Sequence, residues 1–148
     1  MIALDTNILV AAHRREYPAH EHALSLVRER AEGTAPWALP WPCLHEFLAV
    51  VTNARIFVEP TPLPEALGVL DALLESPSLR LLSESPGYWP LLKSLSTAGG
   101  IAGARVHDAR IAALCLHNGV SELWTADRDF SRFPKLKWRN PFVGRAGA

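Results

Sequence analysis

Apolar residues along the chain follow two different spacings, and the two spacings alternate. Short, nearly continuous apolar runs are separated by longer stretches in which apolar residues return every three or four positions. The short runs predict buried strands, and the longer stretches predict helices with one apolar face. The predicted strands are 1–4, 37–39, 79–82, 122–126 and 136–138, and the predicted helices are 7–13, 20–30, 43–53, 65–75, 88–97 and 105–117.

Strands that alternate with longer helices are typical of an α/β fold, in which helices cover a parallel sheet. The chain has 148 residues, so we expect a single domain that spans 1–148. Hydrophobic residues make up 49% of the sequence, which is enough for a core and excludes a disordered chain. Cys43 and Cys115 match no zinc or disulfide spacing, and we expect buried free thiols.

The segment before Asp5 contains no basic leader, and no apolar stretch reaches the ~20 residues needed to cross a bilayer. We therefore expect a cytoplasmic protein that does not enter a membrane. The 15 basic and 15 acidic residues give a formal net charge of zero, which neither requires nor excludes a nucleic-acid partner. Evidence for such a partner has to come from local clusters of charge.

Basic residues gather near the C-terminus, where 128–145 contains six of them and a single acidic residue. A cluster of this kind suits an RNA backbone, although a solvated charged surface explains it equally well. The candidate substrate-binding residues are Arg128, Arg132, Lys135 and Lys137. Three tryptophans have either a core role or a role in stacking on RNA bases: Trp37, Trp41 and Trp89.

Four acidic residues occupy positions at which an α/β sheet binds its ligands. Asp5 and Asp127 directly follow predicted strands, and ligands of open parallel sheets lie beyond the carboxyl ends of the strands. Glu46 and Asp108 are expected in the first turns of their helices. Each has an ordinary explanation alone, as a turn-forming Asp or as a charge that complements the helix dipole. Together they would crowd negative charge into one cleft, and the repulsion opposes folding unless a cation binds.

Carboxylate oxygens with retained water are the ligands that Mg²⁺ or Mn²⁺ prefers. In an enzyme that cleaves phosphodiesters, such an ion neutralises the phosphate and activates water. Asn7 and Thr125 lie beside the acidic residues and are placed to orient them. A helix cap for Asn7 and a strand-end hydroxyl for Thr125 are equally good alternatives.

Four parts of the sequence carry a family resemblance: 4–9 (LDTNIL), the helical Glu46, 108–113 (DARIAA) and 125–130 (TADRDF). Each is a weak motif alone, whereas the ordered set is specific and extends over nearly the whole chain. In this set the chain resembles the PIN-domain family, and specifically the VapC-type toxins of bacterial toxin–antitoxin pairs. The resemblance implies a three-layer sandwich with a central, mostly parallel, twisted sheet flanked by helices.

The resemblance also implies an endoribonuclease that uses Mg²⁺ or Mn²⁺, forms a homodimer, and is inhibited by a small antitoxin lying across the active-site groove. Carried over residue by residue, it makes Asp5 and Asp108 the principal metal ligands. Glu46 and Asp127 complete the catalytic quartet, with Asp127 also a metal ligand. Asp129 corresponds to an accessory carboxylate, and a turn cap is its alternative role.

Two other functions fit part of the pattern. A phosphohydrolase with Asp5 as its nucleophile normally has a second acid two residues later, where this chain has Asn7. A PIN-like module that binds RNA or a protein without cutting would gain nothing from crowded carboxylates. The ribonuclease is therefore the preferred interpretation.

Overall fold

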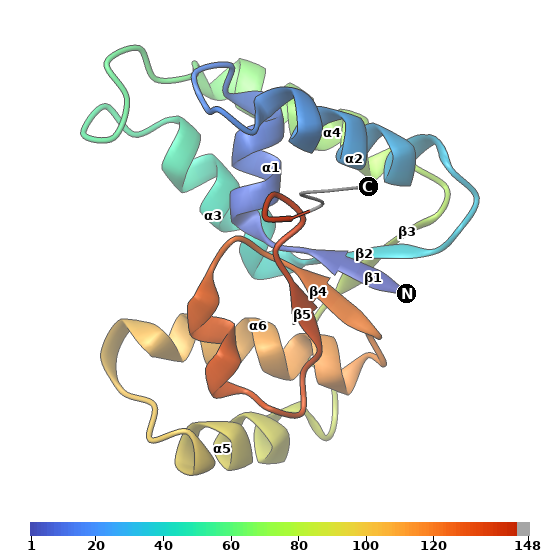
Figure 1. Cartoon of the computed structure of the whole chain (residues 1–148), viewed down its shortest axis with the longest axis vertical. Helices are drawn as coiled ribbons and strands as arrows, with labels where there is room; N and C mark the ends of the chain where they lie inside the picture. Colours follow the sequence, from blue (N-terminus) through green and yellow to red (C-terminus); the bar gives the residue numbers. More distant parts are fainter. Residues whose placement is uncertain (145–148) are drawn as a thin grey trace.

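The computed structural model describes residues 1–144, and within them five parallel strands form one sheet between two layers of helices (Figure 1). The spatial order of the strands is β3-β2-β1-β4-β5, and all four neighbouring pairs are parallel. Their bounds are β1 (Ile2–Leu4), β2 (Trp37–Pro40), β3 (Leu79–Leu82), β4 (Glu122–Trp124) and β5 (Trp138–Arg139).

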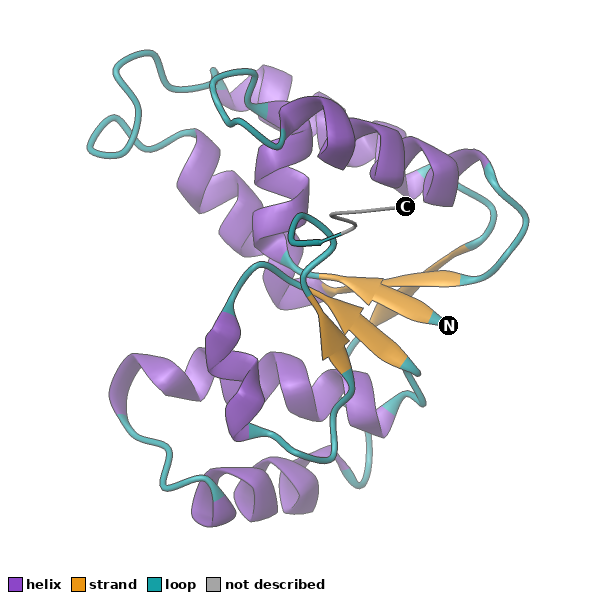
Figure 2. Ribbon diagram, in the orientation of Figure 1, coloured by secondary structure: helices purple, strands orange, loops and turns teal. Residues whose placement is uncertain are grey.

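Four helices cover one face of the sheet and two cover the other (Figure 2). The first layer contains α1 (Thr6–His13), α2 (His20–Glu32), α3 (Trp41–Val51) and α4 (Leu63–Leu74). The second contains α5 (Tyr88–Ala98) and α6 (Val106–His117). Right-handed crossovers explain the division, because the chain moves outward from β1 to β3 and then returns across the sheet to β4. Two short 3-10 helices complete the described chain: η1 (Gly103–Arg105) and η2 (Arg128–Arg132).

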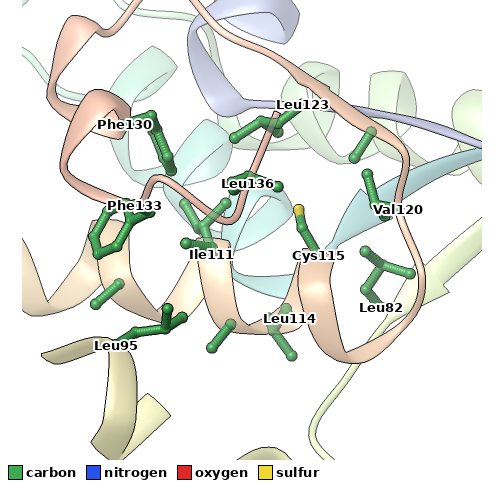
Figure 3. Close-up of a cluster of buried hydrophobic side chains, with 14 of the residues drawn as sticks. Leu82, Leu95, Ile111, Leu114, Cys115, Val120, Leu123, Phe130, Phe133 and Leu136 are labelled. Carbon is green, nitrogen blue, oxygen red and sulfur yellow. The ribbon is translucent and has the colours of Figure 1, made fainter. Parts of the chain in front are cut away.

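Each layer of helices has its own core, because side chains alternate between the two faces of every strand. Leu4 and Trp37 belong to the core under α1 to α4, whereas Ala3 belongs to the core on the α6 side. Figure 3 shows the second core, in which Ile111 of α6 and Phe130 of η2 lie near one another. Burial on both faces is the reason that the strands read as continuous apolar runs.

Every predicted helix and strand is present, with differences at the ends. The helix predicted from 43 begins at Trp41, because Pro42 fits a first turn, where no amide hydrogen bond is lost. The prediction that Glu46 lies in the first turn is therefore wrong, since Glu46 lies in the second. The strand predicted to run to 126 ends at Trp124, and the last strand begins at Trp138.

Cys43 and Cys115 are buried free thiols, as predicted. Across residues 1–144, none of the helices combines the length and the apolar character that a membrane span requires. Arg145, the last residue of the predicted basic cluster, lies outside the described residues.

Candidate active site

The acidic residues meet where the order of the strands reverses. From β1 the chain continues to β2, and from β4 it continues to β5, in the opposite direction across the sheet. A crevice opens between the carboxyl ends of two neighbouring strands whose connections diverge in this way. A pocket of about 210 Å³ lies at this position. Its walls include all four predicted carboxylates: Asp5, Glu46, Asp108 and Asp127.

Asp5 is a buried carboxylate held by a full set of donors. It caps the N-terminus of α1, where its Oδ1 accepts the backbone N–H of Thr6 at 2.7 Å. Its Oδ2 accepts the Thr125 hydroxyl at 2.7 Å and the Asn7 amide at 3.0 Å. Burial raises the pKa of Asp5, and the hydrogen bonds from Thr125 and Thr6 act against the increase.

Asn7 and Thr125 tie the start of α1 to the loop after β4. The Asn7 amide donates to Thr125 Oγ1 at 3.0 Å, and Asn7 Oδ1 accepts the backbone N–H of Ala126 at 2.9 Å. Thr125 Oγ1 also accepts the backbone N–H of Asp127 at 3.0 Å. The cap of α1 is Asp5, so Asn7 does not have the alternative role of a helix cap. Both side chains orient acidic neighbours.

Three further polar residues of the pocket were not predicted. The buried Thr6 hydroxyl donates to Glu46 Oε2 at 2.8 Å and fixes that exposed carboxylate against α1. Thr6 stands inside the LDTNIL motif, and that position was the only available signal. His107 and Tyr17 also line the pocket. His107 precedes Asp108, whereas nothing in the sequence marks Tyr17, which lies between α1 and α2.

Asp108, Asp127 and Asp129 form the tightest acidic group, because one carboxylate oxygen from each lies within 4.8 Å of the others. Burial and then, in decreasing order, the negative charges of Asp127, Asp5, Asp129 and Glu46 together raise the pKa of Asp108 to about 6. Asp127 Oδ1 accepts the backbone N–H of Asp129 at 2.8 Å, so Asp127 is the cap of η2. Mutually repelling oxygen donors of this kind fit a hard divalent cation.

The tight group differs from the predicted metal ligands in one member. The prediction contained Asp5 with Asp108 and Asp127, whereas the compact group contains Asp129 in place of Asp5. Both carboxylate oxygens of Asp5 already accept hydrogen bonds from the protein. Asp129 therefore joins Asp108 and Asp127 as a residue that could hold a cation, and the metal-ligand role of Asp5 stays a prediction.

The predicted substrate-binding residues lie in different places. Arg128 and Arg132 are exposed on η2, which follows Asp127, and Lys135 is exposed in the next turn. Lys137 Nζ lies 3.4 Å from Glu122 Oε2, at the amino end of β4. The acidic pocket is at the carboxyl end, so the structure does not bring Lys137 to it.

Of the three tryptophans, Trp37 has the core role, and a role of Trp41 or Trp89 in stacking on RNA bases stays a prediction. Trp37 is fully buried in the core. Trp41, at the start of α3, has 36% of its surface exposed, and Trp89 on α5 has 66%. The two exposed rings are open to a partner molecule.

A family model, the PIN domain, matches residues 2–136. The chain is 37% identical over 145 residues to VapC ribonuclease Mb2897 of Mycobacterium bovis, and the match covers 98% of each chain. It is 31% identical over 140 residues to ribonuclease VapC48 of Mycobacterium tuberculosis, covering 95% of this chain and 97% of the relative.

Two solved structures share the fold. VapBC2 of Rickettsia felis, bound to a DNA fragment from its promoter, gives a TM-score of 0.62 at 24% identity over 95% of this chain and 98% of that one. VapC20 of Mycobacterium tuberculosis, a toxin that cleaves the sarcin–ricin loop, gives 0.65 at 18% identity over 88% and 93%. The family match and the full-length identities agree with the fold and with the acidic pocket, and the chain therefore belongs to the PIN-domain family, alongside the VapC ribonucleases.

Proposed function

We propose that this chain is a metal-dependent endoribonuclease and the toxin of a toxin–antitoxin pair. The observation that carries the proposal is the convergence of Asp5, Glu46, Asp108 and Asp127 on one pocket. Full-length relatives named VapC ribonucleases support RNA as the substrate. We also expect it to act in the cytoplasm, where such a substrate is found.

Asp108, Asp127 and Asp129 would hold Mg²⁺ or Mn²⁺, and Asp5 keeps the strand ends in place around them. A bound ion supplies Lewis acidity toward the phosphate and toward water. Glu46 accepts the Thr6 hydroxyl with Oε2, and within residues 1–144 no group donates to its Oε1. That oxygen can accept a proton from the attacking water as the water oxygen bonds to phosphorus. The P–O bond to the departing oxygen then breaks, and solvent water protonates the departing oxygen.

Cleavage of defined single-stranded and hairpin RNAs tests this function. With Mg²⁺ or Mn²⁺ the purified chain should cut these RNAs, and EDTA should stop it. Release of phosphate from small esters without RNA cleavage would favour the phosphohydrolase, and RNA binding without cleavage would favour the binding module. Cleavage that persists in EDTA would contradict the metal mechanism.

A separate apolar groove supports the proposal that the chain binds a protein partner. It has a volume of about 670 Å³ and lies between α1, α2 and α4, where Leu9, Leu24, Val27 and Leu73 line it. A groove of this kind suits the apolar face of a partner segment. We propose that a segment of the antitoxin binds there, in keeping with toxin–antitoxin neighbours such as VapBC2.

Expression of the chain alone should arrest bacterial growth, and a small protein encoded beside it should relieve the arrest. Leu24→Glu, which places a charge in the apolar groove, should weaken that rescue without lowering cleavage in vitro. Normal growth with abundant folded protein would contradict the toxin assignment. We further propose a homodimer, which light scattering of the purified chain would test.

A further inference from the structure

A second groove, of about 640 Å³, runs from the acidic pocket between α3 and the start of α6. Glu46, His107, Asp108 and Ile111 line both cavities, so the two adjoin. The groove is distinct from the apolar groove between α1, α2 and α4. Its remaining wall residues include Pro42, His45, Ala49, Ala104, Arg105 and Arg110.

The sequence keeps this groove open in two ways. Ala49 on α3 and Ala104 on η1 are small side chains, so neither fills the space between the helices. Gly103 has a φ of 62°, a left-handed conformation that suits glycine, and it begins η1, which ends at Arg105. The groove is therefore built into the entry to α6.

The groove has both acidic and basic wall residues. Glu46 and Asp108 are shared with the pocket, Asp129 lies in the tight acidic group with Asp108, and His45, Arg105 and Arg110 also line the groove. Arg110 is paired with Glu84 at 3.0 Å, whereas exposed Arg105 makes no ion pair within residues 1–144. A strand whose scissile phosphate lies among carboxylates needs a positive charge at a neighbouring phosphate, and Arg105 supplies one.

An aromatic pair stands beside the groove. The rings of Trp41 and His45 are stacked at 6.0 Å and 28°, and His45 is a wall residue. Trp41 remains partly exposed, which leaves ring surface available to a base. Unstacked bases of single-stranded RNA bind to such rings with little dependence on sequence.

We propose that the α3–α6 groove binds the nucleotides next to the scissile phosphate in single-stranded RNA. Arg105 contacts a backbone phosphate, and the Trp41–His45 pair stacks on a base. This inference rests on the proposed ribonuclease function and adds the path of its substrate. It also separates the path from Lys137, which pairs with Glu122 at the amino end of β4.

The test compares variants of the groove with matched variants elsewhere. Arg105→Gln and Trp41→Ala change the groove, while Arg80→Gln on β3 and Trp89→Ala on α5 change exposed residues of the same types outside its walls. KM and kcat are measured on a defined single-stranded RNA. The Kd for the same RNA is measured against salt in an Asp127→Asn background, which disables cleavage and keeps the shape of the site.

Each groove variant should raise KM and Kd about ten-fold and change kcat by no more than about two-fold. Arg105→Gln should also reduce the slope of log Kd against log salt by about 0.7, the value for one phosphate contact on a single strand. Arg105→Lys should restore the slope, and Trp41→Phe should restore most of the affinity. The two control variants should behave as the unchanged chain does.

The outcomes distinguish this inference from the function on which it rests. If the unchanged chain cleaves RNA and the groove variants match it in KM, Kd and salt slope, the groove inference is wrong and the ribonuclease stands. Loss of antitoxin affinity with unchanged RNA affinity would also overturn the inference and assign the groove to a protein. If the unchanged chain neither binds nor cleaves RNA, both proposals fail.

Discussion

Replacing Asp108 by Asn separates a catalytic carboxylate from a structural one, because the shape is kept and the charge is removed. In the metal-free protein the pKa of Asp108 is raised from 3.8 to about 6, so the folded state disfavours its charged form. Without solvent screening, this difference in pKa corresponds to a loss of about 3 kcal/mol in the free energy of unfolding. Asp108 is only half-buried, and solvent screening reduces this to about 1 kcal/mol.

The pH dependence gives the sign of the effect. Between pH 3.8 and about 6 the folded protein holds the Asp108 proton more tightly than the unfolded chain, so stability falls as pH rises through this window. Asn does not titrate, so Asp108→Asn does not lose stability across this pH window. The variant should therefore match the unchanged chain near pH 4 and be about 1 kcal/mol more stable at pH 7, or about 2–4 °C in Tm.

Thermal melts in EDTA at several pH values, followed by the same melts in Mg²⁺, test this reasoning. Mg²⁺ should raise the Tm of the unchanged chain through binding to the folded state, and should do so much less for Asp108→Asn. RNA cleavage should fall by at least about two orders of magnitude. A metal-free variant that unfolds, or one that Mg²⁺ stabilises fully, would refute the reasoning and leave Asp108 as a charge at the helix start worth about 0.3–1 kcal/mol.

Three further changes have expected results. Thr125→Val leaves buried polar partners unpaired, so urea unfolding should show a loss of about 1–3 kcal/mol, and an unchanged midpoint would contradict the network. Thr6→Val removes the donor to Glu46, so kcat should fall about ten-fold while the free energy of unfolding changes by about 1 kcal/mol. A ten-fold rise in KM with an unchanged kcat would contradict this role of Thr6. Protons compete with the cation at Asp108, so calorimetric Mg²⁺ affinity should weaken as pH falls below about 6, and constant affinity to pH 5 would exclude this competition.

The sequence predicts the fold well because strands buried on both faces and helices buried on one face have different apolar spacings. It also predicts the positions of Asp5 and Asp108, since the end of a parallel strand and the start of a helix are properties of the local sequence. The turn of α3 that carries Glu46 was misplaced by the choice of first residue, Cys43 in place of Trp41. An error of two residues at a helix end is enough to move a side chain into another turn.

Contacts between distant segments are the part that local patterns do not contain. Thr6 and Glu46 are 40 positions apart, and only the packing of α1 against α3 brings them together. The basic residues near the C-terminus are one cluster in the sequence, but parallel pairing of β4 with β5 places Lys137 beside Glu122, away from the pocket. In the same way, the groove between α3 and α6 unites residues that no sequence pattern groups.

Three consecutive side chains at the start of α1 hold the site together. Asp5 accepts a hydrogen bond from the hydroxyl of Thr125, which follows β4, and the Thr6 hydroxyl donates one to Glu46 on α3. Asn7 accepts a hydrogen bond from the backbone N–H of Ala126, the residue before Asp127. None of these three side chains belongs to the apolar cores on the two faces of the sheet. Loss of the Thr6 or Asn7 contact should therefore displace a carboxylate while the sheet stays folded, and activity should fall further than stability.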